Sequence, residues 1–169
     1  MNNDSVGKII AFILMTITTM LAVLIILTRA DSVVDSYITN VATSFVDTCR
    51  TTGKIEPDEY EIFCGNIYDA GDYSIEICHK QKMAYFDGSE ARVDYKEVYT
   101  DDITSYMYDE TEAPRAYQMN AGDVIKITVR KESGGLTNGI LQFFMTSDGT
   151  VNILVNYSGT VGSNGAVVE

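Results

Sequence analysis

The N-terminal part of the chain is dominated by one apolar run. From Ile9 to Thr28, twenty residues pass without a charged side chain. A helix of this length spans about 30 Å, which is the thickness of the hydrocarbon core of a bilayer. A helix that is apolar on every side needs lipid or neighbouring helices around it. We expect this segment to be an assembly helix, whose main side chains are Ile9, Ile10, Phe12, Ile13, Leu14, Ile17, Leu21, Leu24, Ile25 and Leu27.

After Arg29 the apolar positions thin to a stripe at helical spacing. Val34, Ile38, Val41 and Phe45, followed by Cys49, are separated by steps of four, three, four and four residues. This spacing places them on one face of a helix, which predicts that a sheet packs against them. No glycine or proline interrupts the chain from Lys8 to Thr52, and Gly53 is a natural stop. We therefore predict one continuous helix of about 45 residues; the alternative is an anchor followed by a separate helix.

The remaining pattern predicts a second helix and several short strands. Pro57 begins a short helix over 57–68, because proline suits the first turn. Period-two alternation indicates strands at 72–82 and 124–131, with weaker candidates at 93–99 and 103–108. The region before a last strand at 151–157 is ambiguous between a hairpin at Asp148-Gly149 and a short helix within 136–145, and the tail from 158 is expected to be loose.

These elements predict an α+β protein with a long N-terminal helix and a small, mostly antiparallel sheet. The front half of this helix is apolar, and its back half is amphipathic. We divide the chain into a hydrophobic helix (1–30), its amphipathic continuation (31–53) and an α+β globular domain (54–169).

Charge and cysteine content narrow the functional classes. The chain has 24 acidic and 12 basic residues, a formal net charge of −12. Because this charge repels phosphate backbones, we expect no nucleic-acid partner. The cysteines, Cys49, Cys64 and Cys78, match no CxxC motif. They are either one disulfide plus a free thiol, with the pairing open, or three small buried residues.

No pattern in the chain points to catalysis or to a cofactor. His79 is the only histidine, and its lysine neighbours at 80 and 82 predict a strand surface residue. Five carboxylates lie within 101–112, but without the spacing or glycine of an EF-hand, so we interpret them as a solvated loop. We therefore expect no enzyme activity, no metal and no cofactor.

The apolar run also has an alternative interpretation as a cleaved signal peptide. Signal peptides have a shorter apolar core, about 7 to 15 residues, preceded by net positive charge. Here Asp4 and Lys8 cancel, and Thr28-Arg29-Ala30 is a poor cleavage site. The pattern therefore favours a retained helix, with the acidic C-terminal part outside the cell.

Several phrases of the sequence resemble a known group of proteins. A long helix carrying a small sheet domain is similar to type IV pilins and pseudopilins. The phrases "SFVDTCRTTGKIEPDEYEIFCGNI", "YSIEICHKQK", "YQMNAGDVIKITV" and "VNYSGTV" resemble those of TadE-like, Tad-pilus-associated proteins of Gram-positive anaerobic bacteria. The likeness covers roughly 80 to 130 residues.

The resemblance implies a structural subunit of a surface filament. Such a subunit enters the cytoplasmic membrane and is then assembled at the cell surface with other copies of itself by a pilus machine. The alternative is a single-pass anchored domain that acts as a minor pseudopilin or binding component. One departure concerns processing: Gly7 is present, but Phe12 stands where prepilins carry glutamate and Asp4 precedes the glycine.

Overall fold

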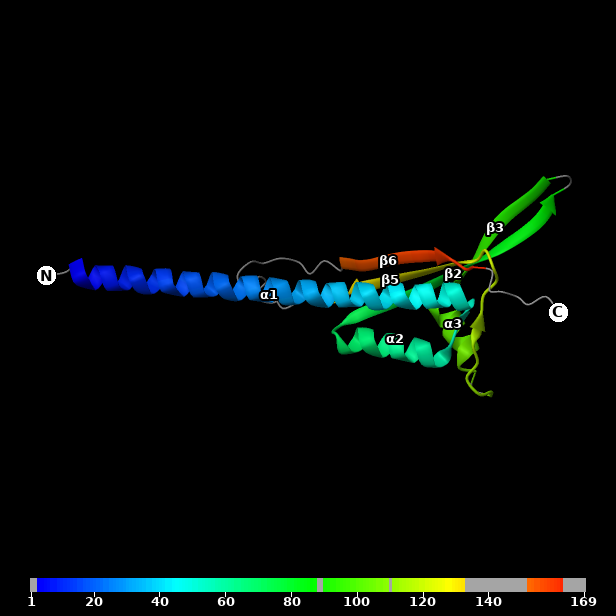
Figure 1. Ribbon diagram of the computed structural model, residues 1–169, viewed down its shortest axis with the longest axis horizontal. Helices are drawn as coiled ribbons and strands as arrows, with labels where there is room; N and C mark the ends of the chain where they lie inside the picture. The colour runs from blue at the N-terminus through cyan, green and yellow to red at the C-terminus, as the bar shows by residue number, and fades with distance from the viewer. Residues whose placement is uncertain (1–2, 88–89, 110, 133–151, 163–169) are drawn as a thin grey trace. The chain divides into compact units, whose positions relative to one another are not determined.

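The computed structural model describes residues 3–87, 90–109, 111–132 and 152–162 (Figure 1). By their contacts the described residues form two units, a front segment (residues 3–36) and a sheet unit (residues 37–132 and 152–162). The elements in chain order are α1 (Asn3–Thr52), β1 (Lys54–Ile55), α2 (Pro57–Asp69), β2 (Tyr73–Asp87), β3 (Glu90–Tyr99), α3 (Thr100–Met107), β4 (Tyr117–Gln118), β5 (Val124–Lys131) and β6 (Asn152–Thr160).

The predicted α+β class and pilin-like layout are confirmed. One long N-terminal helix, a short second helix and antiparallel sheets make up the described chain. α1 is continuous, as the unbroken sequence predicts, and ends where Gly53 takes a φ of 72°. The Gly53 N–H donates to the Cys49 carbonyl at 2.8 Å, closing the last turn.

The main sheet has four antiparallel strands in the order β3-β2-β5-β6. A second, two-stranded antiparallel pair joins β1 to β4. On β5, Ile125, Ile127 and Val129 are fully buried, as period-two alternation predicts. Ile77 of β2 lies opposite Ile127 and is buried on the same face.

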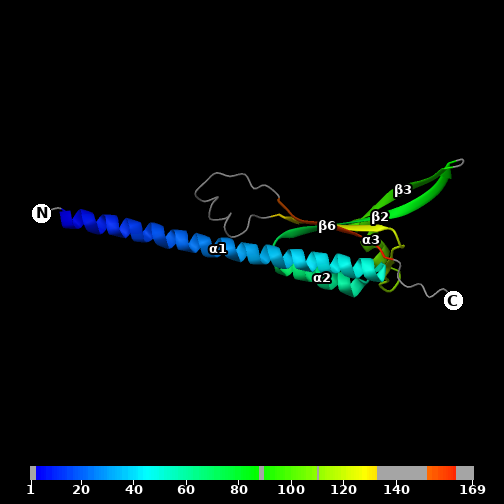
Figure 2. The same ribbon diagram turned by 45° about the horizontal axis from the view of Figure 1, so that its top comes forward.

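The core of the sheet unit lies between this inner face and the helices. α2 runs beside the C-terminal part of α1 in both ribbon views (Figures 1 and 2). The rings of Phe45 in α1 and Phe63 in α2 are stacked, with centroids 4.3 Å apart. At the end of α1, the Tyr157 hydroxyl of β6 lies 3.2 Å from Asp47 Oδ1, and the Gly162 N–H donates to the Arg50 carbonyl at 2.9 Å.

One predicted strand is wrong. Residues 103–108 were expected to be extended, but they belong to α3 and to the turn after it. Ile103 and Met107 are four residues apart and both fully buried, which is a helical repeat. The Thr100 hydroxyl accepts the Ile77 N–H at 2.7 Å, which joins the start of α3 to β2. The tyrosines at 106 and 108 had favoured a strand.

The C-terminal prediction is only partly correct. β6 continues three residues beyond the predicted strand end, to Thr160, and Val161 is buried rather than loose. The Val161 N–H donates to the Asp123 carbonyl at 2.8 Å. The hairpin at Asp148-Gly149, its helical alternative and the last residues of the tail lie outside the described residues.

Ile38 is a fully buried side chain of α1, so its truncation tests the core. We expect Ile38→Ala to lower the free energy of unfolding by about 3 kcal/mol, because it leaves a cavity under the sheet. Ile62→Ala, at a side chain that is 65% exposed, is the matched control and should change it by less than about 0.5 kcal/mol. All 11 tyrosines lie at or after Tyr37, so near-ultraviolet circular dichroism in detergent reports the sheet unit. Equal losses from both variants would contradict this packing.

Tyr108 gives the sheet unit an alkaline pH dependence. Its hydroxyl lies 3.1 Å from Glu61 Oε1, and loss of hydration, followed by this hydrogen bond, raises its pKa to about 12. The pKa of an unfolded tyrosine is about 10. A raised pKa means that the full stability is present below pH 10 and is lost as pH rises toward 12. We expect urea midpoints to fall over this interval, and less so in Tyr108→Phe; identical profiles would be the contrary result.

Candidate functional site

Within the front segment, residues 9–28 of α1 carry an apolar surface, and none of these residues is buried. Of the predicted assembly residues, eight are exposed and two, Leu24 and Leu27, are half-buried. Phe12 is the most open of the eight, at 72%. None of the most apolar 18-residue window is buried. The helix is therefore long and apolar enough to be a membrane anchor or a signal sequence.

The four threonine hydroxyls within the run 9–28 already form hydrogen bonds inside the helix. Thr16, Thr18, Thr19 and Thr28 each donate their hydroxyl to the carbonyl four residues earlier, at 2.8 to 2.9 Å. A threonine bonded in this way exposes its methyl group and leaves no unpaired donor. The run 9–28 is thus suited to an environment without water, although it contains four hydroxyls.

The residues of the predicted sheet-packing stripe differ in how deeply they are buried. Ile38 and Phe45 are buried, whereas Val34 and Val41 are half-buried. The stripe omitted two residues, since Ala42 and Val46 are both fully buried. Their spacing of four residues was present in the sequence, but alanine is a weak hydrophobic signal.

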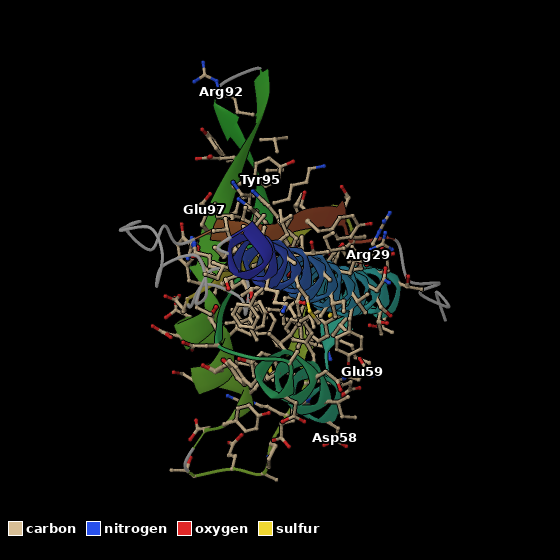
Figure 3. All side chains as sticks on the ribbon, turned by 90° about the vertical axis from the view of Figure 1, so that its left-hand side faces the viewer. Arg29, Asp58, Glu59, Arg92, Tyr95 and Glu97 are labelled. Atoms are coloured by element: carbon tan, nitrogen blue, oxygen red, sulfur yellow. The ribbon has the colours of Figure 1, made fainter. Side chains whose placement is uncertain are left out.

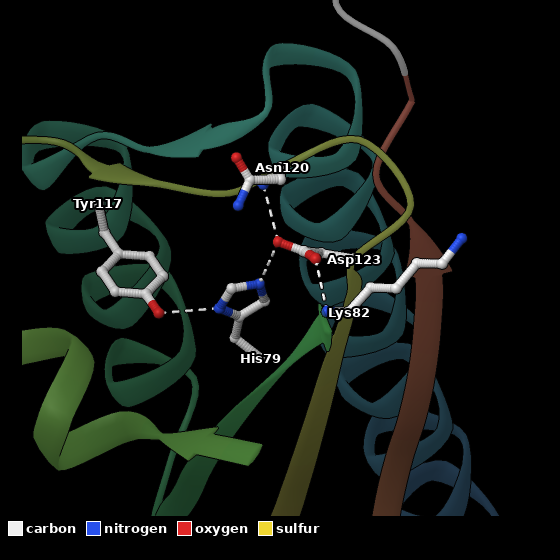
Figure 4. A network of polar contacts seen from close by, with 5 residues as sticks. All are labelled: His79, Lys82, Tyr117, Asn120 and Asp123. Carbon is white, nitrogen blue, oxygen red and sulfur yellow. Dashed lines mark hydrogen bonds and ion pairs between the residues drawn. The ribbon is translucent and has the colours of Figure 1, made fainter. Parts of the chain in front are cut away.

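The prediction for His79 is wrong. Its side chain lies on the inner face of β2 and the residue is only 2% exposed. Nδ1 is 2.8 Å from the Tyr117 hydroxyl and Nε2 is 3.0 Å from Asp123 Oδ2 (Figure 4). A carboxylate only accepts hydrogen bonds, so Nε2 carries a hydrogen and donates it to Asp123. Sequence reasoning missed this because Tyr117 and Asp123 lie 38 and 44 residues away.

Asp123 is the centre of this polar network. Its carboxylate accepts the backbone N–H of Lys82 at 2.7 Å and that of Asn120 at 2.8 Å, in addition to His79. The turn before it depends on Gly122, whose φ of 90° favours glycine. The network joins β2, β4 and the start of β5, and the side chains of His79 and Asp123 at its centre are only 3% and 1% exposed. Its geometry is that of a clamp that holds the end of the sheet.

The three cysteines are free thiols. Cys49 and Cys78 are buried and Cys64 is half-buried. Burial is the main cause that raises the pKa of the Cys64 and Cys78 thiols above the usual value. A raised pKa lowers the thiolate fraction at neutral pH and with it the reactivity.

The described carboxylates of 101–109 and 112 do not gather with other ligands. Asp101 and Asp102 lie exposed in the first turn of α3. Glu112 pairs with Arg115 at 2.8 Å, and Asp109 Oδ1 accepts from the hydroxyl and N–H of Thr111. Among the described residues no group of three or more His, Cys, Asp or Glu side chains could hold a metal ion.

Comparison of the chain with protein-family models, with curated proteins and with solved structures finds no match in any of the three. Any assignment of function therefore rests on the chain's own residues.

Replacing Asp123 tests the clamp. Asp123→Ala leaves the N–H groups of Lys82 and Asn120 and one ring nitrogen of His79 buried without a partner, so we expect a loss of about 3 kcal/mol or more in stability. Asp123→Asn keeps one acceptor oxygen and should lose less. Asp94→Ala, at an exposed position of β3, is the control. Hydrogen exchange should accelerate at the Lys82 and Asn120 amides; unchanged exchange there would refute the clamp.

Proposed function

We propose that this chain is a structural subunit of a type IV pilus-like, Tad-like extracellular filament. The observation that carries the proposal is the apolar run 9–28 in the front segment of α1, twenty uncharged residues of which none is buried. Burying such a helix removes well over ~1,000 Å² of apolar surface from water, which is worth tens of kcal/mol as an upper bound. Neighbouring copies supply that cover in the filament, and the membrane supplies it before assembly.

The sheet unit supports the other part of this proposal, which is that the domain after the apolar run is exported and lies outside the cell. Its net acidic surface keeps an exported domain soluble. Its core includes residues of α1 that lie after the front segment, since Ile38 and Cys49 are fully buried. The partners are other copies of the chain and the machinery that extracts it from the membrane. The resemblance to TadE-like proteins also supports a filament subunit. Because Phe12 stands where prepilins carry glutamate, the charge pairing that this glutamate makes in prepilins is not used at position 12.

A second candidate is a single-pass anchored domain that acts as a minor pseudopilin or as a binding component of the machine. The length of the apolar run favours it, since twenty residues match the thickness of one bilayer. In this role the protein stays with the membrane and is extracted by detergent as a small species. Neither candidate involves catalysis.

A charge in the middle of the apolar run separates the two candidates. Ile17 is half exposed and lies near the centre of the run. Ile17→Lys should remove the protein from sheared fibres, because an unpaired ammonium would be buried between helices. A membrane helix tolerates a central lysine at a cost of roughly 3 kcal/mol, so anchoring should weaken rather than fail. Ile17→Leu is the matched control and should behave like the natural chain.

The readout is electron microscopy of material sheared from cells, with an antibody against residues after Arg29, and immunoblots of the membrane fraction. Fibres labelled along their length in the control and unlabelled in Ile17→Lys are the expected result. If the unaltered protein never appears in fibres and remains in membranes, the filament proposal is wrong and the anchored domain stands.

A further inference from the structure

The β2–β3 hairpin extends beyond the rest of the sheet. Only Tyr73–Lys80 of β2 pairs with β5, whereas pairing with β3 continues to Asp87. The arm, defined as residues 81–87 and 90–96, is therefore a two-stranded ribbon about 23 Å long. Two-stranded ribbons are marginally stable in water on their own. In Figures 1 and 2 the arm projects away from the other strands.

One face of the arm combines apolar and cationic side chains. Met83 and Tyr85 follow each other on this face of β2 and are 44% and 46% exposed. Lys96 lies opposite Gln81, and Arg92 lies opposite Tyr85, so one cation stands near each end of the face. Asp94, the one carboxylate between these two cations, accepts the N–H of its neighbour Tyr95 at 2.8 Å. The next pair toward the tip, Asp87 and Glu90, adds two carboxylates, so the cationic part of the face lies nearer the base of the arm.

The sheet unit also carries an open groove of about 390 Å³ between α1 and α2. Its floor is the stacked pair Phe45 and Phe63, and its rim includes Tyr37 and Ile62, which are 46% and 65% exposed. Along α1 the lining runs from Tyr37 to Thr48, a length of about 17 Å. The groove is thus apolar and slightly shorter than the arm.

A carboxylate in this groove lacks a partner. Glu59 is the one charged residue of the lining, and its Oε2 is buried without a hydrogen bond among the described residues. A buried, unpaired carboxylate oxygen is costly and calls for a donor. The surroundings are also acidic, because the segment 56–72 has six carboxylates and no lysine or arginine. A cation carried on an apolar surface is therefore the chemical complement of this acidic, largely apolar groove.

The base of the arm, at Lys96, meets this description, but the arm of the same copy does not face the groove. Figure 3 shows Arg92 and Tyr95 of the arm on one side of the sheet unit and Asp58 and Glu59 of α2 on the opposite side. We propose that the arm of one copy lies in the α1–α2 groove of a second copy, with Met83 and Tyr85 over the aromatic floor and Lys96 donating to Glu59. This inference rests on the proposed function, since it names the contact between successive subunits.

The contact joins two different surfaces, so it is heterologous. Each copy keeps a free arm on one side and a free groove on the other, and such contacts continue into an open helical array unless the rotation closes a ring. The arm thereby extends the assembly outside the apolar helices. Polar and apolar complementarity together fix its register, because Lys96 and Tyr85 lie on the same face of the ribbon.

Photo-crosslinking in the full chain tests the contact. A benzoylphenylalanine residue replaces Tyr85, cells are irradiated, and sheared fibres and membranes are analysed by denaturing gels and mass spectrometry. We expect a covalent dimer in which position 85 is joined to the segment 57–69. The same probe at Ile153, which is 58% exposed on β6, is the control and should not reach α2. Lys96→Glu should lower the dimer yield at least about tenfold, and Lys96→Arg should keep it.

The outcomes separate this inference from the proposed function. Labelled fibres whose crosslinks join position 85 to any segment other than 57–69 overturn the arm–groove contact and leave the filament intact. Protein confined to membranes overturns the filament; a dimer joined to 57–69 there still supports the contact, and no dimer overturns it. Near-ultraviolet circular dichroism of Lys96→Glu must match the natural chain, which shows that a lost crosslink is not a folding defect.

Discussion

The sheet unit depends on one constraint, which is that the inner face of a four-stranded sheet must be covered by a helix. Ile77, Ile127 and Val129 leave that face apolar, and a sheet with one apolar face is stable only when a second layer removes it from water. The back half of α1 supplies most of this layer through Ile38 and its helical neighbours, with α2 beside it. The same helix is apolar on all sides in its front segment. The single helix α1 therefore has two roles. Its back half contributes to the core of the sheet unit, and its front half carries an apolar surface that is stable only against lipid or other helices.

The sequence predicted the fold well where its periodicity is long and regular. The alternation over 124–131 and the helical spacing from Ile38 to Phe45 each extend over more than one repeat. A repeated pattern predicts the element even where a single residue departs from it. α3 was missed because it is only eight residues long and contains tyrosine, which favours strands. Its helical repeat consists of a single pair, Ile103 and Met107. The arm was missed for a different reason, because a strand pattern does not reveal where one of its two partners ends.

Some candidate sites consist of consecutive residues, and others are assembled from residues that are far apart in the sequence. The apolar front segment is a property of consecutive residues, and it was predicted from composition alone. The clamp around Asp123 is assembled from residues up to 44 apart in the chain, and its polar members look like surface residues when each is considered with its neighbours. The groove with Glu59 is of the same kind, since it needs the antiparallel placement of two helices and the burial of one oxygen atom. Chemistry that arises from packing is not encoded in any window of the sequence.

The net charge of −12 sets a further condition on any assembly of identical copies. Like-charged domains repel, but at physiological ionic strength this repulsion is screened beyond about 8 Å. Contacts between copies therefore depend on short-range terms, namely apolar burial and local charge pairs. The front segment satisfies this condition because it carries no charge between Ile9 and Thr28. The α2 surface does not satisfy it alone, since its carboxylates would face those of a symmetric partner. A contact that uses α2 must pair it with a different, cation-bearing surface, which favours heterologous over two-fold association and so favours an open array.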